Sequence, residues 1–240
     1  MHNKPIAIIG AMDSELVTLL GALEDKQAES FCGLTFYTGK LKGQPAVLVK
    51  CGIGKVNAAR CAQILLDRFD PEALINTGIA GGVGPGLHVG DIVVATGLVQ
   101  HDYDISAFGY AKGNLGDRSH EKEPTVFWAD ERVAGAVTEA AEQVLGKDKL
   151  HRGLIATGDQ FISGAEKKAS IYGEFQALAA EMEGGAIAQV AALGHVPFAV
   201  IRAISDLADG TAAASYDAFE QAAADASAAT VLGAMEKLAE

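Results

Sequence analysis

Acidic side chains stand at the ends of several apolar segments of this sequence. Glu15 is expected on the first turn of a helix that follows the first apolar run, and Asp206 ends the last such run. Glu181 and Glu183 flank Met182 and would point to the same face of a strand. Two carboxylates that close raise the pKa of at least one of them, or need a cation or hydroxyl partner. Helix-dipole stabilisation or capping would be a simpler role for Glu15 and Asp206.

An arginine and several apolar side chains lie close to these acids in the sequence. Arg202 precedes Asp206 in the last apolar run and is either a partner for the acids or one half of an ordinary salt bridge. Together the segment ends predict a pocket with several acids, a glycine floor and an apolar wall. Such a pocket suits a neutral polar ligand with a flat apolar part, which describes a nucleoside and not a phosphorylated ligand. The predicted wall residues are Met12, Ile53, Phe161 and Met182.

Short apolar runs alternate with helical patterns along the chain, and no linker or repeat divides it. We therefore predict one α/β domain, residues 1–240, with a central mixed, largely parallel sheet flanked by helices. In such a fold ligands bind beyond the carboxyl ends of the strands, where the acids stand. A polar, irregular loop is expected at 104–128. Strands are expected at 5–10, 34–41, 45–51, 73–77, 91–99, 154–157, 178–182 and 198–204, and helices at 13–23, 56–69, 130–145, 165–172, 185–193 and 216–238.

The composition argues against several classes of function. Acidic residues number 31 against 19 basic ones, and the formal net charge of -12 would repel nucleic acid and anionic lipid. No apolar stretch is long enough to span a membrane, and Asp13 and Glu15 interrupt the first one before a signal peptide could form. The histidines lack zinc-binding spacing, and the cysteines lack a CxxC pair. We expect a cytoplasmic protein without a metal, whose thiols are reduced and buried.

Two glycine-rich turns match nucleotide-binding motifs only in part. Gly52-Ile53-Gly54 follows a predicted strand and opens a helix, but Asn57 holds the third glycine position of a dinucleotide fingerprint. The 77–86 stretch lacks the lysine and following hydroxyl residue of a P-loop. A dehydrogenase function would also leave all of the acids unexplained, so these turns are expected to bring backbone close to a ligand.

The acids and glycine turns lie in segments that resemble the 5'-methylthioadenosine/S-adenosylhomocysteine nucleosidase family, within the purine nucleoside and uridine phosphorylase superfamily. The similarity extends from Ile8 to about Phe219. It implies a nucleoside phosphorylase-like fold and hydrolysis of the adenine–ribose bond without a metal or organic cofactor. The segments that carry it are 8–15 (IIGAMDSE), 52–58 (GIGKVNA), 76–82 (NTGIAGG), 89–93 (VGDIV), 107–110 (AFGY), 158–162 (GDQFI), 181–184 (EMEG) and 200–206 (VIRAISD).

The resemblance implies a role for each acid in a hydrolytic reaction. Asp206, supported by Ser205, matches the general acid that protonates purine N7, and burial beside other acids would keep it protonated. Glu15 matches the residue that activates the attacking water, and Arg202 would orient that water or Glu15. Glu183 matches the acid that hydrogen-bonds the ribose hydroxyls, and its charge would favour the cationic sugar.

The other matched positions surround the sugar, the base and the 5' substituent. Met182 is implied to lie against the sugar and Phe161 to stack on adenine, while the Ile162 backbone reads the Watson–Crick edge. Ile105 and Phe108 match residues that a second subunit contributes, so a homodimer is implied, with the site completed across its interface. The remaining positions are Ala80, Gly81 and Glu181 around adenine, and Met12, Ile53 and Tyr216 around the apolar 5' substituent.

Two departures from the family pattern fall in the predicted site, and we expect activity to survive both. Ile79 stands where well-known members have Ser, and Tyr216 stands where Phe is common. Three alternatives remain open: a nucleosidase for another purine nucleoside such as futalosine or its 6-amino form, a nucleoside phosphorylase, or a non-catalytic nucleoside-binding protein. Against phosphorolysis, the positions that would supply an Arg and a Ser for phosphate hold Asn76 and Ile79, and Glu15 would repel phosphate.

Overall fold

The predicted alternation of strands and helices runs through the chain. The computed structural model describes residues 4–239, so the outermost positions of the predicted domain 1–240 lie outside the described residues. The first three residues of the segment considered as a signal peptide are among them. The strands are β1 (Ile6–Gly10), β2 (Glu24–Phe31), β3 (Leu34–Leu41), β4 (Gln44–Lys50), β5 (Ala73–Asn76), β6 (Ile79–Gly82), β7 (Ile92–Gln100), β8 (Phe127–Trp128), β9 (Leu150–Thr157), β10 (Ala179–Glu181) and β11 (Phe198–Asp206). The helices are α1 (Asp13–Ala22), α2 (Lys55–Phe69), α3 (Glu131–Leu145), α4 (Ala165–Phe175), α5 (Gly184–Leu193) and α6 (Ala212–Lys237), with 3-10 turns η1 (Ser106–Phe108), η2 (Arg118–His120) and η3 (Lys147–Lys149).

The strands form one 11-stranded sheet in the order β2-β3-β4-β1-β5-β11-β6-β10-β9-β7-β8. The run from β4 to β6 is parallel, but β10 pairs with β6 in the antiparallel sense. β11 also pairs antiparallel with β7, so the strands between them close on themselves. The predicted α/β class and mixed sheet are confirmed. The sheet differs in detail from the predicted largely parallel one, because the bulged, fully buried β11 pairs parallel with β5 and β6 but antiparallel with β7, which closes the sheet.

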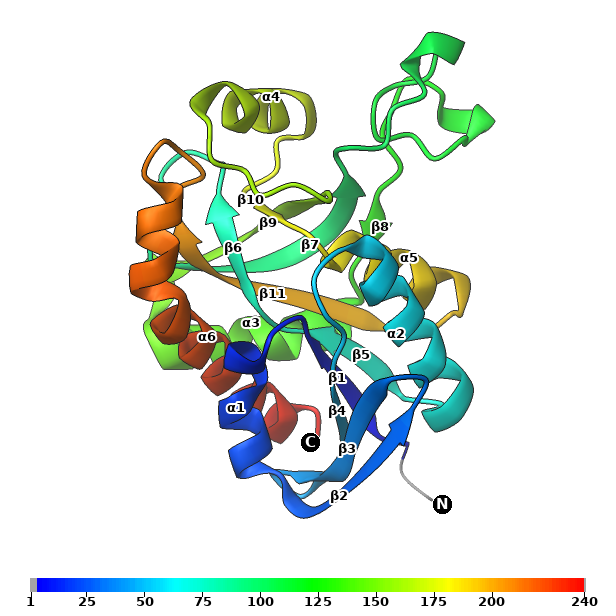
Figure 1. Cartoon of the computed structure of the whole chain (residues 1–240), viewed down its shortest axis with the longest axis vertical. Coiled ribbons are helices and arrows are strands. Elements are labelled where there is room, and N and C mark those ends of the chain that lie inside the picture. Colours follow the sequence, from blue (N-terminus) through cyan, green and yellow to red (C-terminus); the bar gives the residue numbers. More distant parts are fainter. Residues whose placement is uncertain (1–3, 240) are drawn as a thin grey trace.

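Two groups of helices cover the sheet, as Figure 1 shows. Helices α1, α3 and α6 pack over one apolar cluster, which contains Leu16, Val137 and Val231. Helices α2 and α5 pack over the other, which contains Leu65 and Ile187. Both clusters include residues of the central strands β1, β5 and β11, so the ends of these strands are fixed by packing from both sides.

Two strands depart from the sequence patterns. β2, with the sequence EDKQAESF, is exposed along its whole length and is a strand only because it pairs with β3 at the edge of the sheet. β6, with the sequence IAGG, has the composition of a turn but lies between β11 and β10. Helix α6 begins at Ala212, earlier than the predicted start at 216. In these places tertiary pairing overrides local propensity.

The expectation of buried thiols is wrong for one of the three cysteines. Cys51 and Cys61 are buried, but Cys32 is exposed. Cys32 and Gly33 form the tight turn between β2 and β3, both with positive φ, so the chain reverses at the surface there. Within residues 4–239 no helix is long and apolar enough to cross a membrane, and no cluster of His, Cys, Asp or Glu is arranged to hold a metal ion.

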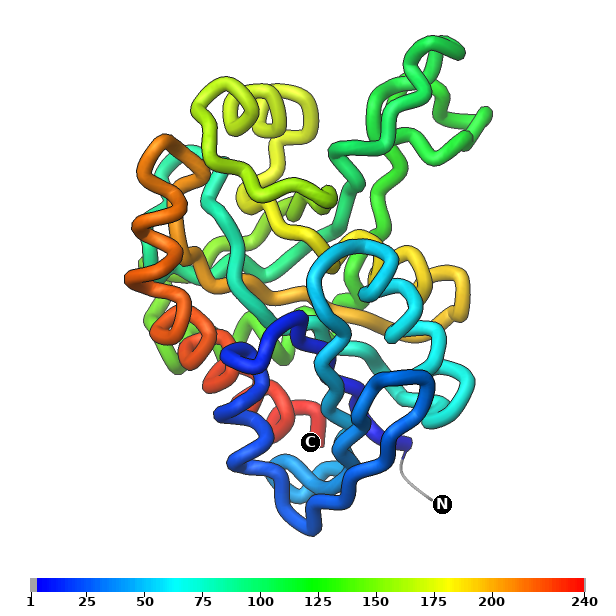
Figure 2. Tube along the Cα trace, in the orientation of Figure 1, coloured from blue at the N-terminus to red at the C-terminus, as the bar shows by residue number. Residues whose placement is uncertain are grey.

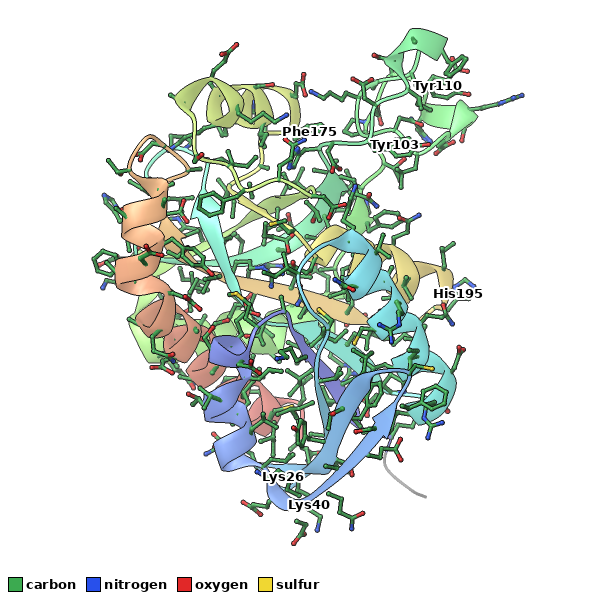
Figure 3. The ribbon with its side chains drawn as sticks, viewed as in Figure 1. Lys26, Lys40, Tyr103, Tyr110, Phe175 and His195 are labelled. Carbon is green, nitrogen blue, oxygen red and sulfur yellow. The ribbon has the colours of Figure 1, made fainter. Side chains whose placement is uncertain are left out.

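The predicted irregular loop contains a structured excursion, which we call the projecting segment (residues 103–126). It extends away from the body of the molecule in Figure 2, and Figure 3 shows Tyr103 and Tyr110 within it. The buried Asn114 organises it by donating to the carbonyl oxygens of His120 and Glu123, both at 2.8 Å. The segment leaves β7 and returns through β8, which pairs with β7.

Candidate active site

A cavity of about 420 Å³ lies between the starts of α1 and α6 and the loops after β4 and β9. Its volume is typical of a small-molecule site. Glu15 and Asp206 line the same cavity, as a nucleoside-cleaving site requires. The predicted residues that line it are Met12, Glu15, Ile53, Ala80, Gly81, Phe161, Ile162, Glu181, Met182, Glu183, Ser205, Asp206 and Tyr216. Ile79 lines it too, together with residues that sequence analysis missed: Ala11, Gln160, Ala180, Ala213 and Asp217.

The missed residues had a sequence signal, because most adjoin predicted ones. Gln160 lies between Gly158-Asp159 and Phe161 in a matched segment, and Asp217 follows Tyr216. Ala213 was missed because it lies in the part of α6 that precedes its predicted start. A sequence pattern that marks the end of a strand or helix thus predicts which segments lie near the site. Which side chains of those segments line the cavity depends on the tertiary structure.

Glu15 is held by backbone donors around the start of α1. Its Oε2 accepts hydrogen bonds from the N–H groups of Ala11 (2.5 Å) and Met12 (3.0 Å), and its Oε1 accepts one from Ile79 (3.3 Å). A Cβ at position 78 would lie only 2.5 Å from Oε1 and would clash with it, so the absence of a side chain at Gly78 gives the carboxylate room. Burial raises the pKa of Glu15, although the charge of the nearby arginine and the three N–H donors oppose the rise. The carboxylate therefore has a fixed direction and an increased tendency to accept a proton.

Asp206 is directed into the cavity by an irregularity near the end of β11. The register against β6 shifts between Ile204 and Asp206, and such a bulge changes the direction of the side chains that follow. Its Oδ2 accepts a hydrogen bond from the Ser205 hydroxyl (2.9 Å), and its Oδ1 accepts one from the Ala208 N–H (2.8 Å). A Cβ at Gly81 would lie 3.0 Å from Oδ1. Burial raises the pKa of Asp206, which favours the protonated form that an acid catalyst needs.

Arg202 lies beneath the cavity and is not among the residues that line it. Its buried guanidinium donates to Glu181 Oε2 (2.5 Å) and to Asn76 Oδ1 (2.5 Å). It makes no hydrogen bond with Glu15, but its charge favours ionisation of that carboxyl. Arg202 thus acts on Glu15 through its charge, and its role in orienting Glu15 or the attacking water stays a prediction.

Glu181 uses both carboxylate oxygens within the protein. Its Oε1 accepts a hydrogen bond from the Thr157 hydroxyl. Its Oε2 accepts bonds from the N–H groups of Glu183 (3.0 Å) and Gly184 (2.7 Å), in addition to the one from Arg202. Of these four bonds one is on Oε1 and three are on Oε2, so Oε1 keeps an acceptor position. The arrangement fixes the start of α5, and the contact between Glu181 and adenine stays a prediction.

Glu183 faces the same guanidinium from the cavity side. Its Oε1 accepts a hydrogen bond from the Gly54 N–H (2.8 Å), and its Oε2 lies 3.9 Å from Arg202. Burial raises the pKa of Glu183 to about 7, and repulsion from Glu181 adds to the rise. Three carboxyls, including that of Glu15, thus share one buried cation. Whenever all three are ionised, the cavity holds excess negative charge.

Aromatic and aliphatic side chains form the opposite wall. The rings of Phe161 and Tyr216 meet edge to face, with centroids 5.9 Å apart and planes at 88°. The Tyr216 hydroxyl donates to Met12 Sδ (3.3 Å), and burial raises its pKa to about 12, so it stays neutral. Phe161 and Ile53 are half-exposed at the mouth. This wall is free to cover an apolar ligand group.

Two predicted residues lie apart from the cavity. Ile105 and Phe108 belong to the projecting segment and do not line the pocket of their own chain. Phe108 is 82% exposed, which is unusual for so large an apolar side chain. Their position leaves them free to contact another molecule.

Comparison with known proteins gives matches over nearly the whole chain. A family model described as the phosphorylase superfamily matches residues 5–236. The 5'-methylthioadenosine/S-adenosylhomocysteine nucleosidase of Geobacillus thermodenitrificans is 44% identical over 227 residues, which cover 94% of each chain. The crystal structure of the 5'-methylthioadenosine/S-adenosylhomocysteine nucleosidase from Neisseria meningitidis, in complex with methylthio-immucillin-A, is 40% identical. It has a TM-score of 0.91 and covers 97% of this chain and 99% of that one.

A more distant structural match has a different named activity. The structure of a futalosine hydrolase mutant of Helicobacter pylori is 31% identical, has a TM-score of 0.89, and covers 96% of this chain and 98% of that one. The same fold thus occurs in proteins named for activities on different nucleosides.

Proposed function

Since the chain belongs to the 5'-methylthioadenosine/S-adenosylhomocysteine nucleosidases of the phosphorylase superfamily, we propose that Asp206 and Glu15 are the acid and the base of its reaction. The enzyme hydrolyses the N-glycosidic bond of these two nucleosides and releases adenine and a 5-thio-substituted ribose. The observation that carries the assignment is that two buried carboxyls, each with a raised pKa, line one cavity.

Cleavage of the C1'–N9 bond develops negative charge on the purine and positive charge on the sugar. Asp206 gives its proton to purine N7, so that the base leaves as neutral adenine. A water molecule attacks C1' from the other face and gives its proton to Glu15. The raised pKa values suit both steps, because one carboxyl must start protonated and the other must accept a proton near neutral pH.

The excess negative charge beneath the sugar supports the same reaction. Glu15, Glu181 and Glu183 surround the one guanidinium of Arg202. A neutral substrate gains little from this charge, whereas a transition state with a cationic sugar is attracted to it. Interactions that strengthen only in the transition state increase kcat. Glu183, with one oxygen 2.8 Å from the Gly54 N–H, is also placed to accept hydrogen bonds from ribose hydroxyls.

Water, not phosphate, is the expected nucleophile that attacks C1' of the ribose. Within the described chain the residues that line the cavity include neither Lys, Arg nor His, and Glu15 would repel an anion at C1'. Asn76, at a position where a phosphorylase needs a phosphate-binding cation, instead accepts from Arg202. Adenine release from methylthioadenosine should therefore proceed in phosphate-free buffer at the same rate as with added phosphate. Failure to release adenine, or release that requires phosphate, would contradict the proposal.

The same assay with three nucleosides decides the substrate. Met12, Ile53 and Tyr216 form an apolar wall that suits a thioether substituent. We expect methylthioadenosine and S-adenosylhomocysteine to be cleaved with higher kcat/KM than futalosine. A higher value for futalosine would favour the alternative activity.

The pH dependence should reveal Glu183. Because the pKa of Glu183 is raised above the ordinary glutamate value of 4.5, the carboxylate is protonated at a higher pH than an ordinary glutamate as the pH falls. The rate of wild-type hydrolysis should therefore decline below about pH 7, where Glu183 becomes protonated, and at high pH once Asp206 has lost its proton. Glu183→Gln should lower kcat/KM and change the midpoint of the acid limb, because the ionisation of Glu183 no longer contributes to it. An acid limb identical to that of the wild type would contradict this role for Glu183.

The exposed residues of the projecting segment support a homodimer as part of the proposal. Phe108 is largely exposed, and Ile105 lies near it in sequence, outside the cavity of its own chain. In a homodimer these side chains would complete the 5' pocket of the partner and lose their contact with water. The cytoplasmic location likewise stays a prediction from the sequence.

A further inference from the structure

A hydrogen-bonded ring lies just behind the mouth of the cavity, formed by residues that the proposed chemistry does not use. The Lys55 Nζ donates to Asp102 Oδ1 (2.6 Å), and Asp102 Oδ2 accepts a hydrogen bond from the Asp159 N–H (2.9 Å). Asp159 Oδ1 in turn accepts one from the Lys55 N–H (2.8 Å), which closes the ring. None of the three residues lines the cavity. We call them the Asp102 ring.

The Asp102 ring connects three loops that are far apart in sequence. Lys55 follows the turn that bears Ile53 and Gly54, and Asp159 precedes Phe161. Asp102 follows β7 at the root of the projecting segment, next to Tyr103, which Figure 3 labels. Two of these loops form the half-exposed mouth of the cavity. The ring therefore links the two loops that carry these mouth residues.

The ring also reaches the carboxylate that faces the ribose. Gly54 has φ of 96°, and its N–H donates to Glu183 Oε1 (2.8 Å). A Cβ at Gly54 would lie 3.1 Å from Asp159 Oδ1, so the turn and the ring are in close contact. The N-cap residue of helix α2 provides no side-chain hydrogen bond. Asp159, which lies in another loop, accepts a hydrogen bond from the first N–H of the helix instead. Loss of the ring would free Gly54 to move away from Glu183.

The ion pair within the ring is less exposed than a surface ion pair, whereas Asp159 is exposed. The side chains of Lys55 and Asp102 are only 19% and 14% exposed. Burial works against ionisation, but hydrogen bonds from the Lys55 ammonium and the Asp159 N–H lower the pKa of Asp102. Next to it, His101 is buried, and burial lowers its pKa, so it adds no charge. Asp102 is thus an ionised acceptor with both oxygens engaged.

We propose that Asp102 is a positioning residue for the hydrolysis proposed above: through Lys55 and Asp159 it sets the separation of the Gly54 turn and the Phe161 loop, and it keeps the Gly54 N–H on Glu183. The inference rests on the proposed function. A small displacement of groups that contact the substrate is sufficient to slow an enzyme, because catalysis depends on near-attack geometry.

The test is steady-state hydrolysis of methylthioadenosine by Asp102→Asn and Lys55→Met. An asparagine at 102 cannot accept from both partners, so kcat/KM should fall about 10- to 100-fold. The double variant should lose little more than either single variant, because all three break one ring. The matched control is Glu72→Gln, which removes the 2.8 Å ion pair with Arg132, outside both the cavity lining and the projecting segment, and should stay within about twofold of wild type.

A pH profile separates positioning from a merely structural role. The Gly54 N–H stabilises ionised Glu183, so its loss should move the acid limb of Asp102→Asn to higher pH. The other charged groups that face Glu183 are Glu181, Arg202 and Glu15, and the variant leaves them in place. A structural role alone would lower the unfolding temperature and leave the acid limb of the folded enzyme unchanged.

The possible outcomes are distinct. Three results with an active wild type overturn the inference and leave the proposed function intact. In the first, Asp102→Asn and Lys55→Met have kcat/KM within twofold of wild type. In the others, the losses of the two variants add in the double variant, or the acid limb of Asp102→Asn stays where the wild type has it. A wild type that releases no adenine overturns both. Should Asp102→Asn fail to fold, Lys55→Met alone decides by the same kinetic and pH criteria.

Discussion

Replacing Asp206 with Asn should lower kcat for methylthioadenosine by about 10²- to 10⁴-fold, the contribution typical of a positioned general acid. Asparagine has nearly the same shape and still accepts from Ser205 or Ala208, so the cavity should keep its form. An amide hydrogen-bonds N7 but cannot transfer a proton to it. Binding of adenine should therefore persist while turnover is lost, and calorimetric titration alongside single-turnover kinetics would measure the two effects separately.

Ser205→Ala is the matched control for Asp206. The Ser205 hydroxyl donates a hydrogen bond to Asp206 but is not the acid that protonates the base. Its removal should therefore lower kcat about tenfold or less. An Asp206→Asn enzyme that retained more than a tenth of the wild-type kcat would mean that another group protonates the base. Loss of adenine binding in that variant would instead point to a role in binding.

Replacing Glu15 with Gln should cost kcat a comparable factor, about 10²- to 10⁴-fold, because the attacking water then has no base. Glutamine keeps the size of the side chain and an oxygen for the Ala11 and Met12 N–H groups. It has no affinity for a proton near neutral pH. KM should change little, since the neutral substrate makes its main contacts with the walls. Initial rates of adenine release across substrate concentrations give both constants.

Glu220→Gln is the matched control for Glu15. Glu220 accepts a hydrogen bond from Ser14 (2.7 Å) beside the same helix, and it does not line the cavity. Its replacement should leave kcat within about twofold of wild type, because this part-buried contact lies outside the cavity. If Glu15→Gln were as active as this control, water activation would have to come from elsewhere. Circular dichroism would show whether α1, whose first turn Glu15 caps, is intact in both variants.

The sequence determined which segments meet at the site. The acids, glycines and aromatic wall residues follow predicted strands or open predicted helices, and local patterns of this kind depend only on neighbouring residues. Thirteen predicted site residues therefore line the cavity, from Met12 at the start of α1 to Tyr216 on α6. The backbone N–H of Ile79, which any non-proline residue supplies, is one of the three donors to Glu15, so this departure leaves that hydrogen bond in place.

The tertiary structure decided what each of these residues does. Arg202 donates to Glu181 beneath the cavity, because the closed sheet brings the end of β10 within reach of the middle of β11. The bulge before Asp206 directs its carboxyl, and Gly54 holds Glu183 across a sequence separation of 129 residues. Contacts of this kind leave no local pattern. Their energy comes from burial and from partners that only the complete fold brings together.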